Sequence, residues 1–322
     1  MNRKQVKNAL FIAVILILVL VVLYSGLRIL ESTLFLHAPA EVVSKTITHD
    51  GVKYYPRQDI TVVLVMGINQ SGKVVPTEFN NGGPADMLML MVFDEKTETC
   101  NVLSLNRDMM VDMPVLNETG RSVGIFNGQL GYAHTFGDGM EVSCENVRRT
   151  VSNMIHGVNV DYYFSMNMDA ISVLNDAVGG VTVNIVDDFS AVTDSLPMGQ
   201  VTLMGQQAVT FVQARWYVSD HLNINRMERH KEYMRNFVPA LQEKLEKQPG
   251  FVVEAYEKVS DFIVTDCTVQ ILSRLEADYG DYEVDRFLSF EGDNVLGEEY
   301  YEFYADEEKM MDLILELFFD PK

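Results

Sequence analysis

The sequence predicts an α/β protein in which helices cover a central β-sheet. Three apolar, β-branched runs at residues 60–67, 87–94 and 101–106 are each bounded by turn residues, which is the pattern of buried strands. After residue 140, segments with helical periodicity alternate with further short strands. This order predicts one layered domain, because each element must bury its apolar face against another element.

The first three strands are predicted to bring polar side chains to one edge of the sheet. A short polar connection at residues 94–99 predicts an antiparallel hairpin between the second and third strands. If the first two strands are also antiparallel, the end of the first, the start of the second and the end of the third share one edge. Those positions hold Asn69, Asp86, Arg107 and Asp108. Two carboxylates, an amide and a guanidinium suit an anion with a divalent cation beside it.

The later elements follow from periodicity and from the residues that end them. Helices are predicted over residues 141–155, 168–178, 205–214, 225–246, 269–277 and 306–319, and strands over residues 161–166 and 181–186. The glycine-rich residues 120–139 are predicted to be irregular. No second linker or repeat divides the chain after residue 60, so residues 60–322 are predicted to form a single domain.

The N-terminal segment is predicted to be a membrane anchor. Residues 1–8 carry three basic residues and no acid, and residues 9–27 carry no charge. A helix of that length spans roughly 28 Å, about one hydrocarbon core, and the basic flank predicts a cytoplasmic tail and an extracytoplasmic body. Residues 28–59 are then an extracytoplasmic stalk. A cleaved signal peptide is the alternative, but this apolar run is longer than a usual signal sequence, so the uncleaved anchor is preferred.

The balance of charge excludes one class of partner. The chain has a net charge of −21, and four of its 25 basic residues flank the apolar run, which leaves 21 basic and 46 acidic residues elsewhere. Such an acidic surface disfavours binding to nucleic acid. The three cysteines are odd in number and widely spaced, which indicates buried thiols rather than disulfides or a zinc site.

Arg215, Arg226 and Arg229 form a group of positive charges in this acidic chain. Arg226 and Arg229 are spaced i, i+3, so both project from the same side of the predicted helix near its N-terminus. Each arginine alone fits an ordinary solvated helix face. Together with Arg107 at the sheet edge the group favours a phosphate site, because several planar guanidinium groups can neutralise a diphosphate.

Six segments resemble the LytR-CpsA-Psr family of bacterial envelope proteins in their order and spacing. They lie at residues 61–69, 85–90, 104–108, 205–208, 213–215 and 225–229. The resemblance runs from about residue 60 to residue 234 and continues more faintly to the end of the chain. The predicted anchor, stalk and external body also match the layout of this family.

The resemblance implies an α/β/α sandwich with a central mixed sheet and an apolar tunnel for the tail of a polyprenyl pyrophosphate. Asp86 matches a metal-binding or catalytic aspartate, with Asn69 at the second metal position, and Asp108 matches an acid that orients Arg107. The implied phosphate clamp comprises Arg107, Arg215, Arg226 and Arg229, of which Arg107 and Arg215 are also catalytic candidates. The implied cofactor is Mg²⁺ or Mn²⁺.

Several positions depart from the family pattern. Asn69 stands where an aspartate is usual, and Gln213 replaces the first arginine of an Arg-x-Arg pair. The other departures are Pro84-Ala85, Asn106, Ile125 and His230. These changes remove charges from the implied site, so a divalent ion is expected to bind weakly, if at all.

The resemblance implies transfer of a phosphoryl-linked glycopolymer, such as teichoic acid or capsule, from a polyprenyl pyrophosphate carrier to peptidoglycan. In that reaction a sugar hydroxyl attacks phosphorus and polyprenyl phosphate leaves, so catalysis consists mostly of positioning and charge stabilisation. One alternative is a non-catalytic polyprenyl-phosphate-binding or regulatory paralogue, which the missing charges favour. Another is a structural envelope protein that keeps only the fold, against which the group of arginines argues.

Overall fold

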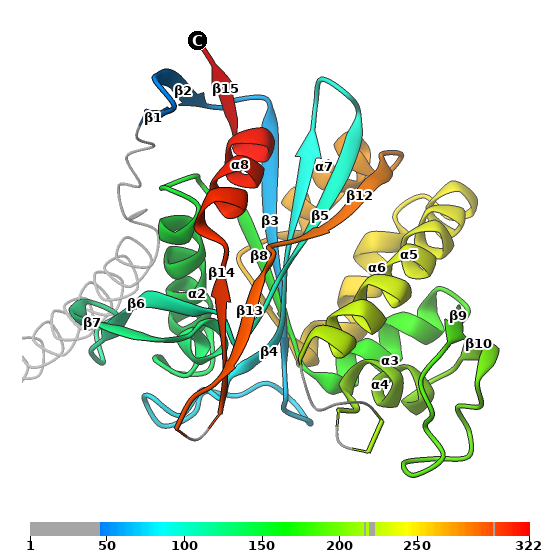
Figure 1. The fold of residues 1–322 in the computed structure, drawn as a ribbon. Helices are drawn as coiled ribbons and strands as arrows, with labels where there is room; N and C mark the ends of the chain where they lie inside the picture. The colour runs from blue at the N-terminus through cyan, green and yellow to red at the C-terminus, as the bar shows by residue number, and fades with distance from the viewer. Residues whose placement is uncertain (1–45, 216, 219–222, 299) are drawn as a thin grey trace, which may run out of the picture. The chain divides into compact units, whose positions relative to one another are not determined.

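The computed structural model describes residues 46–215, 217–218, 223–298 and 300–322 (Figure 1). The predicted tail and anchor, residues 1–8 and 9–27, lie outside these ranges, as do residues 28–45 of the predicted stalk. Within the described ranges, no helix is both long enough and apolar enough to cross a membrane.

A six-stranded mixed sheet forms the centre of the compact unit to which the described residues belong. Its strands lie in the order β11 (Ile263–Thr265), β8 (Tyr162–Met166), β3 (Ile60–Ile68), β4 (Ala85–Asp94), β5 (Thr99–Leu105) and β12 (Glu283–Ser289). As predicted, β3 is antiparallel to β4, and β4 is antiparallel to β5. Strands β8 and β12 pair in parallel with β3 and β5, respectively, and β11 at one border of the sheet is antiparallel to β8. The end of β3, the start of β4 and the end of β5 therefore meet at one edge of the sheet.

Helices cover both faces of this sheet. Alternate residues of β3 and β4 point to opposite faces, and both sets of side chains are largely apolar, so each face needs a cover. On one face, side chains such as Leu64 and Leu90 form the main core with α2 (Glu141–Met154) and α8 (Glu307–Phe318). On the other face, Val65, Met87 and Met89 point toward α3 (Met168–Ala177), α4 (Gln206–Gln213) and α5 (Asn223–Lys247). Figure 1 shows α2 and α8 on one side of the sheet and α5 on the other. The predicted α/β fold with a central mixed sheet is confirmed.

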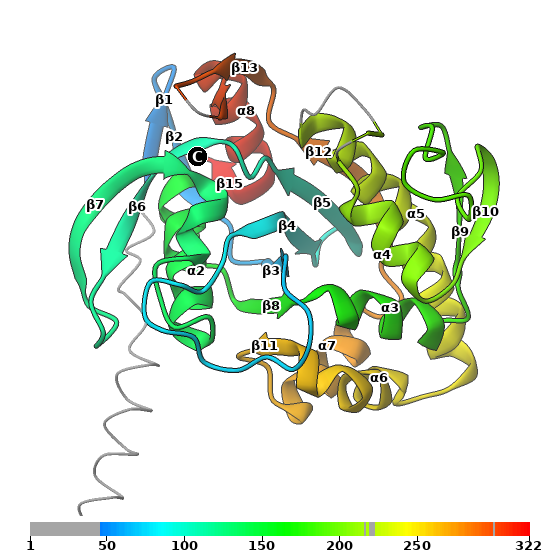
Figure 2. The same ribbon diagram turned by 90° about the horizontal axis from the view of Figure 1, so that it is seen from below.

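Smaller elements surround the sheet (Figure 2). They are the hairpins β6 (Met110–Leu116)–β7 (Ser122–Gln129), β9 (Val181–Ile185)–β10 (Gly199–Leu203) and β13 (Gly292–Leu296)–β14 (Tyr301–Ala305), the helices α6 (Phe251–Val259) and α7 (Val269–Tyr279), and the 3₁₀ turns η1 (Leu130–His134) and η2 (Ser260–Phe262). A second core around Phe189, Leu203 and Phe211 joins β9 and β10 to α4, α5 and α6. This second core fixes α4 beside the sheet edge.

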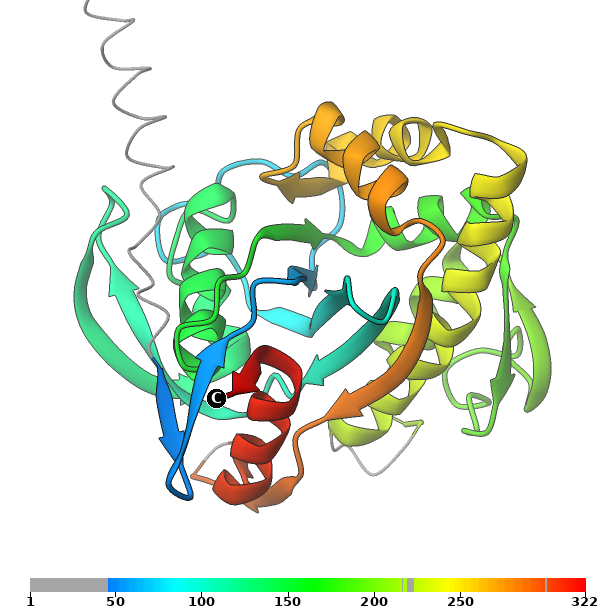
Figure 3. The same ribbon diagram turned by 90° about the horizontal axis from the view of Figure 1, so that it is seen from above.

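Part of the predicted stalk is folded. Strands β1 (Ile47–His49) and β2 (Val52–Pro56) form a three-stranded sheet with the C-terminal β15 (Phe319–Pro321), and Figure 3 shows β2 beside the C-terminus. Arg57 then ties this segment to the central sheet, because its guanidinium donates to both oxygens of Asp94 at 2.7 and 2.8 Å. The described residues 46–59 thus belong to the same compact unit as the sheet, and the predicted boundary at residue 60 is corrected.

The predicted strands and helices are present, and most bounds agree within one or two residues. The expectation that residues 120–139 are irregular is wrong, because they contain β7 and η1. The first six residues of β7 are all exposed, so its sequence lacks the buried–exposed alternation by which a strand is found. Strands β12, β13 and β14 were not predicted either, since their residues are mostly half-buried or exposed.

Candidate functional site

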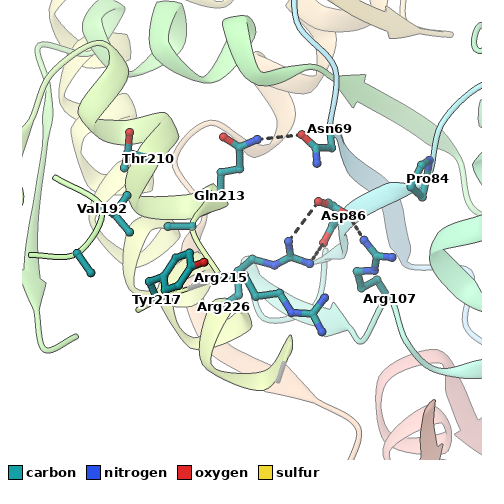
Figure 4. Close-up of a pocket in the computed structure, with 12 residues that line it drawn as sticks. Asn69, Pro84, Asp86, Arg107, Val192, Thr210, Gln213, Arg215, Tyr217 and Arg226 are labelled. Carbon is teal, nitrogen blue, oxygen red and sulfur yellow. Dashed lines mark hydrogen bonds and ion pairs between the residues drawn. The ribbon is translucent and has the colours of Figure 1, made fainter. Parts of the chain in front are cut away.

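The polar sheet edge lies in an open pocket of about 670 Å³ (Figure 4). Segments far apart in the sequence line it: the ends of β3 and β5, the start of β4, the loop between β9 and β10, the end of α4 and the start of α5. The lining residues are Asn69, Pro84, Asp86, Arg107, Ala191, Val192, Thr210, Gln213, Ala214, Arg215, Tyr217 and Arg226. The predicted site residues Asn69, Asp86, Arg107, Arg215 and Arg226 are therefore brought together.

Asp86 lies between two guanidinium groups. Arg107 Nη1 donates to Asp86 Oδ1, and Arg226 Nη1 donates to Asp86 Oδ2 at 3.2 Å. Arg226 also donates from Nη2 to the main-chain oxygen of Asp86 at 3.2 Å. Each carboxylate oxygen of Asp86 thus has a cationic partner within the protein, which neutralises its charge.

Arg226 is 4% exposed, and a pair of asparagines holds it in place. Asn223 Oδ1 accepts from Arg226 Nε at 3.1 Å and from Nη2 at 2.7 Å. Asn223 in turn donates to Asn106 Oδ1 at 2.9 Å, and the same oxygen accepts from the main-chain N–H of Asp108 at 3.0 Å. Asn106 and Asn223 were not candidate site residues, because a polar residue after a strand or at a helix start ordinarily marks a turn or a cap.

Cationic side chains predominate at the pocket. Three guanidinium groups and one carboxylate line it, and the buried Asp108 pairs with one of those guanidinium groups, that of Arg107. Burial, and then the charges of Arg107 and Arg215, lower the pKa of Arg226 to about 9. Arg226 is still protonated at neutral pH, and a bound anion would relieve the repulsion among these groups.

Asp108 lies behind the pocket, where it is 3% exposed. Its Oδ1 accepts from Arg107 Nε at 3.2 Å, while Nη1 of the same guanidinium faces Asp86. Two carboxylates thus fix the plane of the Arg107 guanidinium. This geometry supports the role that the resemblance implies for Asp108, which is to orient Arg107.

Two positions that depart from the family pattern contact each other. Gln213 at the end of α4 donates from Nε2 to Asn69 Oδ1 at 2.9 Å (Figure 4). No local sequence pattern links these two residues, which are 144 positions apart. An uncharged hydrogen bond therefore connects the sheet edge to α4.

The two predicted metal ligands do not fit a divalent ion in this arrangement. Asp86 accepts from Arg107 and Arg226, and the side-chain oxygen of Asn69 accepts from Gln213. A carboxylate neutralised by two guanidinium groups attracts a cation weakly. Across the part of the chain that the structure describes, no group of three or more His, Cys, Asp or Glu side chains could hold a metal ion.

Arg229 does not line the pocket, contrary to its predicted place at the pocket mouth. It is 4% exposed, and its guanidinium donates to Asp187 Oδ2 at 2.6 Å and to the main-chain oxygens of Phe211, at 3.0 Å, and Ala214. The i, i+3 spacing places Arg229 on the same side of α5 as Arg226, but almost one turn further along the helix, where α4 covers it. Arg229 therefore fixes the end of α4 and the loop after β9.

Removing this guanidinium is expected to destabilise the protein. Arg229→Ala leaves Asp187 and two carbonyl oxygens without their buried partner, so the free energy of unfolding should fall by about 3 kcal/mol. Urea denaturation followed by circular dichroism measures the change. Arg235→Ala on the same helix is the control, because the Arg235 side chain is half exposed and should contribute less than about 1 kcal/mol. Equal stability of the two variants would contradict this account of Arg229.

An apolar channel of about 220 Å³ leads inward from the same pocket. Asp86, Gln213 and Arg226 line both spaces. Otherwise the channel is lined by Val65, Gly67, Met87, Met89, Met91, Met166, Met168, Ile171, Leu174, Val212, His230, Tyr233, Met234, Phe237, Val238 and Leu241. It lies between the sheet and the helices α3, α4 and α5.

His230 adds no charge to the channel wall. Its Nε2 lies 2.9 Å from the main-chain oxygen of Val212, and burial together with the charge of Arg226 lowers its pKa to about 3. The imidazole is therefore neutral at physiological pH. Beyond the shared residues at the mouth, the channel has an apolar wall suited to a hydrocarbon chain.

The fold and the two connected spaces define a class of protein: an α/β protein with an arginine-lined pocket that opens on an apolar channel. The sequence pattern of the LytR_cpsA_psr family matches residues 35–316. The chain belongs to this family.

Relatives with assigned names resemble the chain over part of their length. The polyisoprenyl-teichoic acid–peptidoglycan teichoic acid transferase TagU of Oceanobacillus iheyensis is 30% identical over 166 residues, which cover 50% of this chain and 45% of the relative. The protein of the same name from Bacillus subtilis is 25% identical over 221 residues, which cover 66% of this chain and 64% of the relative. The chain therefore matches less than two thirds of each relative.

Solved structures share the fold. Protein gbs0355 from Streptococcus agalactiae has a TM-score of 0.66 at 18% identity, and the match covers 80% of this chain and 86% of that chain. TagV of Bacillus subtilis has a TM-score of 0.60 at 21% identity, and the match covers 81% of this chain and 96% of that chain.

Proposed function

We propose that the protein transfers a phosphoryl-linked glycopolymer from a polyprenyl pyrophosphate carrier to peptidoglycan during cell-envelope assembly. The observation that carries this proposal is the joining of a cationic pocket to an apolar channel through Asp86, Gln213 and Arg226. A ligand that fills both spaces needs an anionic head and a long apolar tail. A polyprenyl pyrophosphate has both parts, and the names of the teichoic acid transferases among the relatives agree with the reaction.

The residues of the pocket would act by positioning and charge stabilisation. The oxygen of an acceptor hydroxyl forms a bond to the phosphorus that carries the glycopolymer, and the bond from that phosphorus to polyprenyl phosphate breaks. Negative charge grows on the leaving oxygens. Arg107, Arg215 and Arg226 are the cationic groups at the pocket that can stabilise it. Asp86, the carboxylate that lines the pocket, would accept the proton of the hydroxyl.

A reconstituted assay tests the reaction. Full-length protein in detergent, given a lipid-linked glycopolymer and peptidoglycan oligomers, should produce polymer attached to the oligomers. Binding of the lipid-linked donor without any transfer would contradict the proposed transfer and would support the alternative of a non-catalytic binding paralogue. The uncharged Asn69–Gln213 pair, which replaces charged residues of the family pattern, is the observation that favours this alternative.

The proposed substrates place the body outside the cell, attached by residues 9–27. Protease added to intact protoplasts should then remove residues 46–322 while leaving a short membrane-bound fragment. An antibody to the C-terminus reports the loss of the body. A body that survives protease in intact protoplasts and is degraded only after lysis would contradict this placement.

A further inference from the structure

The contacts of Asp86 differ from those of a metal ligand. Both of its carboxylate oxygens accept from guanidinium groups, and Arg226 also holds its main-chain oxygen. Its side chain is 11% exposed, and those of Arg107 and Arg226 are 13% and 5% exposed. These ion pairs are shielded from water, which makes them stronger than pairs on an open surface. Asp86 therefore pairs with the two guanidinium groups, those of Arg107 and Arg226, that could otherwise bind an incoming anion.

The side chains of Asn69 and Gln213 are both uncharged, so position 69 does not supply a second carboxylate beside Asp86. The hydrogen bond between the two amides contributes no charge, and it engages the side-chain oxygen that Asn69 could offer to a cation. A further acid, Asp108, is buried and faces Arg107. The side-chain oxygens of Asp86 and Asn69, and Oδ1 of Asp108, thus already accept hydrogen bonds from donors within the protein.

We propose that this pocket binds the diphosphate of its ligand through guanidinium groups alone, without a divalent cation, and that Asp86 is an internal counter-ion which the diphosphate displaces. This inference rests on the proposed function, because it concerns the same ligand head group. Displacement exchanges one anion for another at Arg107 and Arg226, so the guanidinium groups stay paired throughout. It also frees the Asp86 carboxylate at the moment when an acceptor hydroxyl needs a base.

A counter-ion and a metal ligand at position 86 have opposite effects on the affinity for the diphosphate. If Asp86 competes with the diphosphate, Asp86→Asn removes the competitor and tightens binding. If Asp86 holds a metal ion that bridges to the diphosphate, the same substitution weakens binding. Isothermal titration of full-length protein in detergent with geranyl diphosphate, in the presence of a chelator and then of excess Mg²⁺, distinguishes the two cases.

We expect the unmodified protein to bind geranyl diphosphate in the chelator, with an affinity that Mg²⁺ changes less than about threefold. Asp86→Asn should bind about tenfold more tightly, which corresponds to about 1.4 kcal/mol. Binding that requires Mg²⁺, with loss of affinity in Asp86→Asn, would overturn the inference and leave the proposed function standing. No binding of this prenyl diphosphate under either condition would overturn the proposed function as well.

Two variants of the amide pair keep the test independent of the folding of Asp86→Asn. Asn69→Asp adds a carboxylate at the sheet edge and should create Mn²⁺ binding, measured by electron paramagnetic resonance. Adding Gln213→Arg should abolish it, because the new guanidinium pairs with the new carboxylate. Mn²⁺ bound as tightly by the unmodified protein as by Asn69→Asp would show that the unmodified pocket already holds a cation and would overturn the inference.

Discussion

Arg226→Lys is expected to lower the rate of glycopolymer transfer about 100-fold, the effect of removing one preorganised donor from a site of developing charge. Lysine keeps the positive charge but loses the planar fork. That fork contacts Asp86 and Asn223 at the same time, so a lysine ammonium cannot hold the same arrangement. Initial rates in the reconstituted assay measure the effect.

The matched control for this variant is Arg235→Lys on the same helix. Arg235 is half exposed and lies over the ring of Phe287, away from the pocket. Its replacement should leave transfer unchanged within about twofold. Equal rates for the Arg226 and Arg235 variants, both folded by circular dichroism, would mean that Arg226 does not act on the reacting phosphate.

Gly67→Val is expected to reduce binding of a long-chain prenyl diphosphate at least tenfold while leaving binding of inorganic diphosphate unchanged. Gly67 lines the channel on β3, and a Cβ atom at this position would lie 3.2 Å from Met87 Cβ. A glycine inside a strand commonly marks a close approach of another group to the backbone. The two methyl groups of valine would fill the channel just below the pocket and leave the arginines in place.

Gly124→Val in β7 is the control for the channel variant, because open space surrounds this glycine. Crowding at Gly67 should also cost about 1–3 kcal/mol of stability, so both variants are checked by thermal melting. A folded Gly67→Val protein that binds long and short prenyl diphosphates as the unmodified protein does would show that the channel is not where the prenyl chain lies.

Much of the fold follows from local sequence patterns. The runs that became β3, β4 and β5 are apolar and end at turn residues, so both their existence and their antiparallel pairing could be predicted. The sheet of β1, β2 and β15 was not predicted. Strands β1 and β2 form a local hairpin, but their residues are exposed or half-buried, and β15 pairs with β2 from the opposite end of the chain. Exposed strands lack the alternation of buried and exposed residues by which a strand is found, and pairing with a distant segment leaves no local signal.

Some residues of the candidate site could likewise be predicted from the sequence, and others could not. Asp86 and Arg107 follow from strand order, since both stand where strands begin or end at one edge. Arg229 was misplaced because helical spacing fixes the side of a helix but not what covers that side, and here α4 covers it. The Asn69–Gln213 pair could not be predicted, because it depends on the distance between β3 and α4 in the folded protein.

A crystal structure of the protein purified from its host membranes tests the central claim most directly. The account predicts continuous density for a polyprenyl chain in the channel between the sheet and α5, with its phosphate groups against Arg107 and Arg226. Mass spectrometry of the same sample should identify a polyprenyl phosphate or diphosphate. A polyprenyl phosphate found bound at another surface, with the channel closed by its own side chains, would contradict the account.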